Sequence, residues 1–387
     1  MKKLFYFSIV LCLVFLTGCS KYNEKSLVKE LNNKINKVSG YHVDGKMSIY
    51  SGDNKYEYKV QSSYENNNYR VSLVNKSNNH EQIILKNSDG VYVLTPSLNK
   101  SFKFQSDWPK HNSQVYLLQS ILTDLNKDKN VKLTENKNRY VLSTKISYSS
   151  NKNLNNQKIY LDKKLNFKEI EVYDKSGTLQ IRMVFNSIDL KASFNSKYFS
   201  TSENMKSAKI DEDNEYTNKK DNSKSTQEES NSTTKENNSS TTSTNESTSE
   251  NEEETSTADE SNTESNNKER NTTSTLDETI YPMYLPTGTY LSTEETVSKE
   301  EGERTILTFA GDTPFILVEE VAVKSDEYET IPVYGEPTIL LDSIGALSNN
   351  SANFISNGIE YYISGENLTS EDIINVAESI NSISVMK

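Results

Sequence analysis

Cysteine is nearly absent from this 387-residue sequence, which contains only Cys12 and Cys19. Cys12 lies inside an apolar segment that we expect to be removed with a signal peptide, so the processed chain would keep one cysteine. A single cysteine excludes an internal disulfide. We therefore expect the fold to be stabilised by its hydrophobic core or by partners.

Motifs of catalysis are missing as well. None of the three histidines, His42, His80 and His111, has the spacing of a metal site such as HExxH. The sequence has no GxSxG elbow, no P-loop and no dinucleotide-binding glycine fingerprint. Carboxylates are abundant on acidic segments, where the pattern is that of solvated surface, although a carboxylate pair in a cleft would leave no sequence signature. We expect a protein that is not an enzyme and holds no metal or cofactor.

No stretch is apolar over the roughly 20 residues that a membrane-spanning helix needs. The run Leu4–Leu16 is shorter and follows two lysines, which is typical of a signal-peptide core. The residues at its end, Leu16-Thr17-Gly18-Cys19, resemble the bacterial lipobox. The resemblance implies that residues 1–18 are removed and that Cys19 carries a diacylglycerol, which would anchor the chain to the extracytoplasmic face of the cell membrane. The alternative is a short N-terminal anchor with an incidental cysteine.

Each part of the chain is dominated by charge of one sign. Residues 1–210 have a net charge of +15, residues 211–270 of −11 and residues 271–387 of −16. A basic region beside a membrane suits anionic lipid headgroups, wall polymers or an acidic protein partner, and attraction to the acidic tail is the alternative. Nucleic acid is not an expected partner outside the cell membrane.

Apolar residues disappear between the basic and acidic parts. Ala258 is the only one from Thr217 to Thr275. Such a segment cannot bury enough apolar surface to offset the entropy lost on ordering. We therefore expect a disordered linker over residues 206–276.

The first region, residues 19–205, alternates between two kinds of pattern. Apolar residues have helical spacing over Ser26–Val38 and again over Ser113–Leu125. About five strand-like runs follow each of these segments, separated by turn residues such as those at 87–90. Because all links are short, we expect an antiparallel sheet.

Three stretches of this region resemble the LolA/LppX-like superfamily: DGVYVLTPSLNKSFKF (Asp89–Phe104), the hairpins of residues 159–185, and FNSKYF (Phe194–Phe199). The resemblance implies a curved half-barrel of antiparallel strands with helices capping its concave face. Together with the lipobox and the basic charge, the region is similar to clostridial germination lipoproteins of the GerS type. That similarity implies a non-catalytic role in sporulation or germination, through binding and activating a cortex amidase. The long linker and the acidic second domain depart from those short lipoproteins.

The acidic region, residues 277–387, predicts a small α+β domain. Strand patterns occur at Thr305–Gly311, Phe315–Val323 and Ile359–Gly365, and a helix should follow from Leu368 towards Ile383 with Thr369 as its N-cap. The region resembles a small uncharacterised domain that closes many Gram-positive lipoproteins. The resemblance implies sensing or docking and no activity.

Candidate contact residues are few. Phe102, Phe104 and the single tryptophan, Trp108, are candidates for the mouth of a groove or for contact with a partner, and the alternative is a set of core aromatics at a strand end. We expect a membrane-anchored lipoprotein that binds a protein partner, a cell-wall or cortex amidase. The alternatives are a lipid or lipoprotein chaperone with a concave apolar groove, and a regulatory or sensory lipoprotein whose acidic domain binds its basic one.

Overall fold

The computed structural model describes residues 21–106, 108, 114–148, 151–206, 216–218, 275–299 and 302–381. These residues all belong to one compact unit, which residues 1–219 and 273–387 form together. The predicted signal peptide, residues 1–18, lies outside the described residues, and so does nearly all of the predicted linker, residues 206–276. Both stay predictions.

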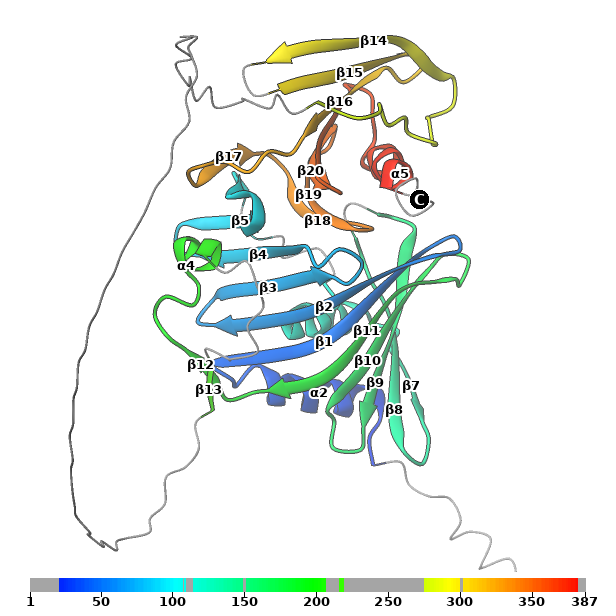
Figure 1. The fold of residues 1–387 in the computed structure, drawn as a ribbon. Helices are drawn as coiled ribbons and strands as arrows, with labels where there is room; N and C mark the ends of the chain where they lie inside the picture. Colours follow the sequence, from blue (N-terminus) through cyan, green and yellow to red (C-terminus); the bar gives the residue numbers. More distant parts are fainter. Residues whose placement is uncertain are drawn as a thin grey trace, which may run out of the picture. The chain divides into compact units, whose positions relative to one another are not determined.

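A sheet of twelve strands forms most of the first region (Figure 1). Its order is β17-β6-β5-β4-β3-β2-β1-β11-β10-β9-β8-β7. The strands are β1 (Gly40–Ser51), β2 (Asn54–Glu65), β3 (Asn68–Asn75), β4 (Glu81–Asn87), β5 (Gly90–Thr95), β6 (Lys100–Phe104), β7 (Lys132–Glu135), β8 (Arg139–Lys145), β9 (Leu154–Asp162), β10 (Phe167–Asp174), β11 (Leu179–Asp189) and β17 (Glu329–Val333).

The chain builds this sheet from its centre outward in two series. β1 pairs with β2 on one side and with β11 on the other, and every pair in the first region is antiparallel. The predicted antiparallel sheet is thus confirmed, and it is open because β7 and β17 are separate edges. A second, two-stranded sheet pairs β12 (Ala192–Phe194) with β13 (Tyr216–Asn218).

The helices of the described residues are short. They are α2 (Glu24–Ile35), α3 (Leu118–Lys127), α4 (Thr201–Lys206), α5 (Ser370–Asn381) and the 3₁₀ turn η1 (Pro96–Leu98). α2 begins two residues before its predicted start because Asn23 caps it: Ser26 N donates to Asn23 Oδ1, and Asn23 N donates to Ser26 Oγ, each at 2.9 Å. α3 begins at Leu118, five residues after the predicted start.

The main core lies between one face of the twelve-stranded sheet and the helices α2 and α3. Leu27 and Leu31 of α2 and Leu118 of α3 are fully buried against strand residues such as Val43 and Val60. The other face is covered at β4 and β5 by α4 and the segment before it, through Phe199 and Met205. This two-sided burial explains why β4 and β5 are apolar almost throughout.

The C-terminal region forms a seven-stranded sheet of order β14-β15-β16-β21-β20-β19-β18. Its strands are β14 (Thr289–Lys299), β15 (Gly302–Gly311), β16 (Phe315–Val321), β18 (Glu336–Leu340), β19 (Ser343–Leu347), β20 (Ser351–Ser356) and β21 (Ile359–Ser364). Ile373, Ala377 and Ile380 of α5 pack on this sheet. The prediction found β15, β16, β21 and α5 but missed the other four strands and β17.

Candidate functional site

The C-terminal region contributes a strand to the sheet of the first region. β17 pairs with β6 in parallel, with Glu329 opposite Lys100. Backbone hydrogen bonds continue the pairing at both ends: Glu329 N donates to Asn99 O at 2.9 Å, and Gln105 N donates to Val333 O at 3.0 Å. Without β17, the hydrogen-bonding groups of β6 would form an open sheet edge.

Buried polar side chains hold the β18–β19 turn against the first region. Gln82 on β4 is 3% exposed and forms two hydrogen bonds with the backbone of Ile344. Its Nε2 donates to Ile344 O at 3.2 Å, and its Oε1 accepts from Ile344 N at 2.6 Å. The Tyr58 hydroxyl donates to Leu341 O at 2.5 Å. Because buried backbone groups need hydrogen-bond partners, these two side chains fix the position of the turn.

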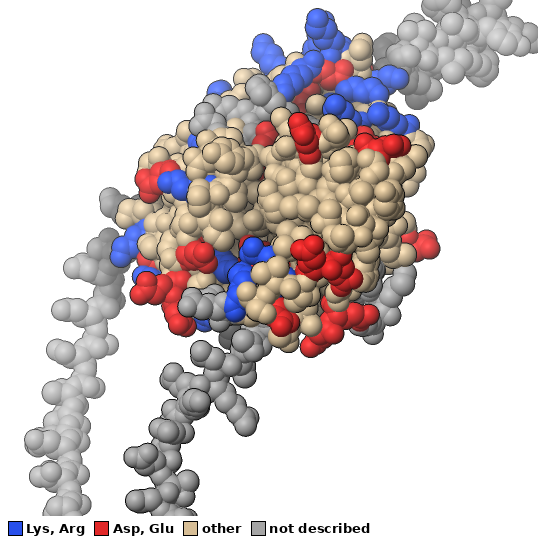
Figure 2. All heavy atoms as spheres, turned by 90° about the horizontal axis from the view of Figure 1, so that it is seen from above, with Lys and Arg blue, Asp and Glu red and all other residues tan. Residues whose placement is uncertain are grey.

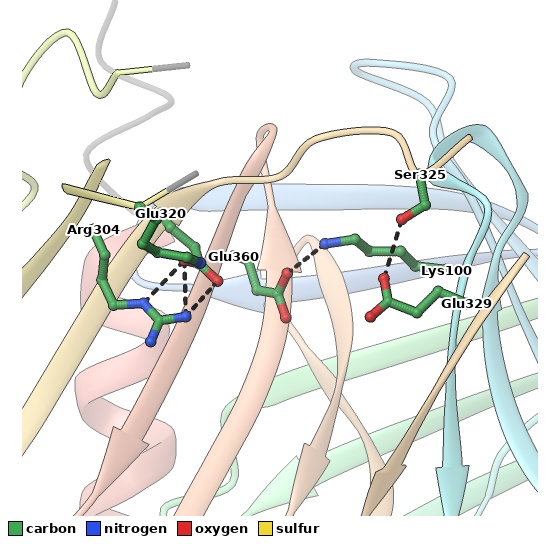
Figure 3. Close-up of polar contacts among 7 residues, drawn as sticks. Lys100, Arg304, Glu320, Ser325, Glu329 and Glu360 are labelled. Atoms are coloured by element: carbon green, nitrogen blue, oxygen red, sulfur yellow. Dashed lines mark hydrogen bonds and ion pairs between the residues drawn. The ribbon is translucent and has the colours of Figure 1, made fainter. Parts of the chain in front are cut away.

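One ion pair also joins the regions. Lys100 Nζ on β6 lies 2.9 Å from Glu360 Oε2 on β21, and the two side chains are 15% and 12% exposed. Figure 3 shows this pair beside the contact of Arg304 with Glu320, in which Arg304 Nε donates to Glu320 Oε2 at 2.9 Å. Further hydrogen bonds cross the junction, such as that from Asn99 Nδ2 to Ser325 O at 2.7 Å. Ile344 and neighbouring C-terminal residues add apolar contacts, because they belong to the main core.

A cavity of about 130 Å³ lies at this junction. It is lined by both regions, with Met47 and Tyr148 from the first and Ile339, Ile374 and Glu378 from the C-terminal one. Small-molecule sites usually measure roughly 300–1,000 Å³. In this arrangement the cavity is therefore too small for a lipid-sized ligand.

Glu378 of the cavity lining and Asp342, which follows the lining residue Leu341, both have raised pKa values. Burial raises the pKa of Glu378 to about 7. Burial also raises the pKa of Asp342 to about 6, although hydrogen bonds from Ser356 and Asn357 to its Oδ2 oppose this. Asp342 Oδ1 is buried without a hydrogen-bond partner. Burial raises the pKa of Tyr56, and the charges of Asp342 and Glu378 raise it further.

Raised carboxyl pKa values predict that stability falls as the pH rises. Glu378 binds its proton more tightly in the folded state than in the unfolded state, where its pKa is near 4.3. Its stabilising contribution is complete below about pH 4 and is lost as the pH rises through 7. We expect Glu378→Gln to reduce the loss in unfolding free energy between pH 6 and pH 8 by about 1 kcal/mol. Urea unfolding at the two pH values measures this.

The control for this prediction is Glu366→Gln, because Glu366 is exposed. Its pH dependence should match that of the wild type. Identical slopes for Glu378→Gln and the wild type would contradict the prediction.

The three aromatic residues predicted as contacts are all buried. Phe102, Phe104 and Trp108 are 1%, 4% and 8% exposed and belong to the main core. The Trp108 ring stacks on that of Tyr69, with a centroid distance of 4.9 Å and an angle of 11° between ring planes. The structure thus brings them together as core aromatics near a strand end, and their contact with a partner stays a prediction.

Cys19, the predicted lipidation site, and His111 lie outside the described residues. His42 is buried with its Nδ1 2.9 Å from Ser63 Oγ, and burial lowers its pKa to about 4. In the described part of the chain, no group of three or more His, Cys, Asp or Glu residues is arranged to hold a metal ion. The same residues include no helix with the length and apolarity needed to cross a membrane.

Among the helices and strands whose exposure is described, the most exposed is β14, an edge strand of 11 residues. Every residue after Thr289 is exposed, and the strand pairs with β15 alone. Tyr290, Leu291 and Val297 on this strand are 60%, 39% and 43% exposed. Figure 2 views the end of the molecule where β14–β16 lie in Figure 1, and it shows a broad uncharged surface rimmed by charged side chains.

Other large apolar side chains are exposed in the same region. Those among the described residues are Tyr281, Met283, Tyr328, Tyr334 and Tyr362, and all lie in the C-terminal region. Tyr281 lies beside β14, because its hydroxyl donates to Glu294 Oε2 at 2.7 Å. β14 and Tyr281 are the candidate site, which we call the β14 edge: residues 289–299 with Tyr281.

Sequence reasoning missed the β14 edge. Residues 289–299 are rich in threonine and contain tyrosine and valine, which favour strands. They lack the alternation of apolar and polar residues that identifies a half-buried strand, because neither face is buried.

A family model described as sporulation protein YdcC-like matches residues 1–199, which is half of the chain. The chain belongs to this family. The YdcC-like match is supported along nearly the whole length by a relative, "Sporulation protein YdcC" of Bacillus subtilis (strain 168). It is 29% identical over 373 residues, which cover 96% of this chain and 94% of the relative.

Solved structures similar to this YdcC-like chain are distant. The complex of MucA and MucB from Pseudomonas aeruginosa matches with 10% identity and a TM-score of 0.30, covering 91% of this chain and 97% of that one. A LolA superfamily protein, NE2245 from Nitrosomonas europaea, matches with 13% identity and a TM-score of 0.29, covering 47% of this chain and 99% of that one. At these scores the likeness carries no argument about function.

Proposed function

We propose that this YdcC-like protein is a lipoprotein, anchored through Cys19 to the extracytoplasmic face of the cell membrane, that acts in sporulation as a non-catalytic binding partner. The partner in this proposal is a cell-wall or cortex amidase. Membership of a sporulation protein family and the lipobox-like residues Leu16–Cys19 support it. The proposal includes a LolA-like first region, supported by two strand series that share a core with α2 and α3.

The observation that carries the binding role is the length and exposure of β14. Native sheets usually protect their edges with short strands, charges or covering segments. The edges at β7 and β18 have four and five residues, whereas β14 has 11. An edge of this length offers alternate backbone groups to an extended peptide, which adds as a further strand. The exposed Tyr290 and Val297 offer side-chain contacts to the same peptide.

Charge selects a basic partner segment over a second copy of this chain. Full-length antiparallel pairing of two β14 strands would place Glu294, the central residue, opposite its own equivalent. Like charges directly opposite each other destabilise a strand pair. Glu295 adds a further negative charge, and Lys299 is the only cation on the strand. We infer that the amidase contributes an extended segment with lysine or arginine.

A charge reversal on β14 tests the proposal in sporulating cells of the native host. A photo-crosslinking residue at Thr296, which is exposed, should capture a wall amidase. Adding Glu295→Lys and Val297→Lys should reduce the yield of that adduct at least tenfold, because both changes repel a basic strand. Mass spectrometry identifies the adduct. Exposed substitutions leave stability nearly unchanged, so the variant should remain folded.

The matched control is Glu366→Lys, an exposed charge reversal in the segment between β21 and α5. It should leave the yield unchanged. Capture of a second copy of the chain, no capture of an amidase, or equal losses in the two variants would each contradict the proposal.

The two alternatives have less support. The cavity at the junction, about 130 Å³, is smaller than a lipid chaperone would need there. A regulatory role would use the contact of the acidic region with the basic one, which exists at Lys100 and Glu360. Most of that junction, however, consists of strand pairing, hydrogen bonds and apolar contacts, which do not respond to salt as ion pairs do.

A further inference from the structure

A hollow of about 340 Å³ lies beside the start of the described chain. Five lysines line it together with one carboxylate, Glu30. The lysines are Lys21, Lys34, Lys37, Lys163 and Lys164. We call this site the lysine hollow. Lys21 is two residues from Cys19, so the hollow is next to the proposed lipid anchor.

Two of the lysines are occupied by the protein itself. Lys34 Nζ donates to Leu165 O at 3.0 Å and to Asn166 Oδ1 at 2.8 Å, which ties α2 to the β9–β10 turn. Lys163 pairs with Glu135 at 2.6 Å. These contacts fix the walls of the hollow. The positive charge that is available to a ligand therefore comes from the other three lysines.

The remaining three lysines are less constrained, although Lys21 Nζ lies 5.0 Å from the centre of the Tyr22 ring. Lys21, Lys37 and Lys164 are exposed, and within the described residues they form no ion pair with a carboxylate. They come from three separate segments: the entry to α2, its exit and the β9–β10 turn. Glu30 offsets one of these charges, and the remaining ammonium groups give a local positive potential that attracts an anion.

The turn that presents Lys164 is rigidly held. Asp162 Oδ1 accepts hydrogen bonds from Lys164 N at 2.8 Å and Asn166 N at 2.9 Å, and Leu165 has a φ of 60°. The Leu165 side chain is buried, at 5% exposure. Lys164 therefore projects from a turn that keeps its position when a ligand binds, which lowers the entropy cost of binding.

We propose that the lysine hollow binds the phosphate of anionic phospholipid headgroups in the membrane that carries the chain. This inference rests on the proposed membrane location, because Lys21 lies at the membrane surface only if Cys19 is lipidated. A lipid anchor and a basic patch together hold a protein at a membrane more firmly than either one alone. Figure 1 places α2 and β14 at opposite ends of the structure, so such binding would direct the β14 edge away from the membrane.

The test uses residues 19–387 with Cys19→Ser, so that acyl chains do not contribute. In a sedimentation assay, this protein should bind phosphatidylcholine vesicles that contain about 30 mol% phosphatidylglycerol. It should not bind vesicles of pure phosphatidylcholine. The triple change Lys21→Gln, Lys37→Gln and Lys164→Gln should lower the partition coefficient about 100-fold, since each lysine near an anionic surface contributes about fivefold.

The control removes the same charge elsewhere, through Lys46→Gln, Lys129→Gln and Lys175→Gln, three exposed lysines of the first region. It should lower partitioning less than fivefold. Equal losses in the two triple variants, or no binding to anionic vesicles, would overturn the proposal.

Inorganic phosphate separates a headgroup site from a site for the free ion. When about 10 mM phosphate replaces chloride at matched ionic strength, the vesicle partition coefficient should stay within about twofold of its value in chloride. Many headgroups act together on a surface, so a free ion competes poorly. Complete displacement would show a free-phosphate site and overturn the membrane assignment. Every vesicle experiment uses a protein that cannot be lipidated. A negative result would therefore contradict the lysine hollow as a headgroup site without bearing on lipidation of Cys19.

Discussion

Replacing Phe102 with alanine is expected to lower the free energy of unfolding by about 3–5 kcal/mol. Phe102 is 1% exposed and lies on β6, opposite Val93 of β5 and Ile331 of β17. Removing its ring leaves a cavity where the C-terminal region joins the first sheet. Urea unfolding measures the loss, and the fluorescence of Trp108, the only tryptophan, reports on the same core.

The control is Tyr334→Ala, because Tyr334 is 78% exposed. Its unfolding free energy should stay within about 0.5 kcal/mol of the wild type. A loss below about 1 kcal/mol for Phe102→Ala would mean that the ring is not part of a packed core. The interpretation of Phe102 as a groove residue would then be favoured.

Cys19→Ser is expected to abolish incorporation of radiolabelled palmitate and to move the processed protein from the membrane fraction to the soluble fraction. Each acyl methylene buried in a bilayer contributes about 0.8 kcal/mol, so two long chains dominate membrane affinity. The lysine hollow alone would hold the chain only weakly. Labelling of sporulating cells followed by membrane fractionation gives both results.

Cys12→Ser is the matched control, because Cys12 lies within the segment predicted to be removed. It should keep both the label and the membrane location. A Cys19→Ser protein that still carries palmitate and remains membrane-bound would remove the basis of the proposed location.

The sequence predicted those elements whose residues alternate between a buried and an exposed side. β2 is an example, because Tyr56, Tyr58 and Val60 are buried while the residues between them are less so. α2 and α5 were found for the same reason, and Thr369 does cap α5: Asp372 N donates to Thr369 Oγ1 at 3.1 Å. The periodicity of apolar residues was therefore sufficient to predict the antiparallel sheet and these helices.

Pairings distant in the chain left no such signal. β17 contains Pro332 and three further residues that are exposed or half-buried, so its sequence resembles a loop. Its partner, β6, carries no mark of a parallel neighbour. The junction also depends on Gln82, whose buried amide bonds a backbone 262 residues away. A polar residue inside an otherwise apolar strand is a weak hint of such a contact.

The candidate site was hidden for the opposite reason. A strand with two exposed faces has no hydrophobic periodicity, so β14 could not be recognised by the method that found β15. The lysine hollow is formed by residues far apart in sequence. Lys34 and Leu165, for example, are 131 residues apart. Net charge predicted a basic region but not the place where three lysines gather.

The pairing of β6 with β17 has a consequence for biosynthesis. Ser101 and Thr330, which meet across these strands, are 229 residues apart. A chain made and exported from its N-terminus therefore presents β6 as a bare template until its last sixty or so residues, about one sixth of the chain, arrive. Premature termination anywhere before Glu329 would leave β6 as an unpaired edge strand. Such a truncated protein would be a substrate for quality-control proteases before it could reach its partner.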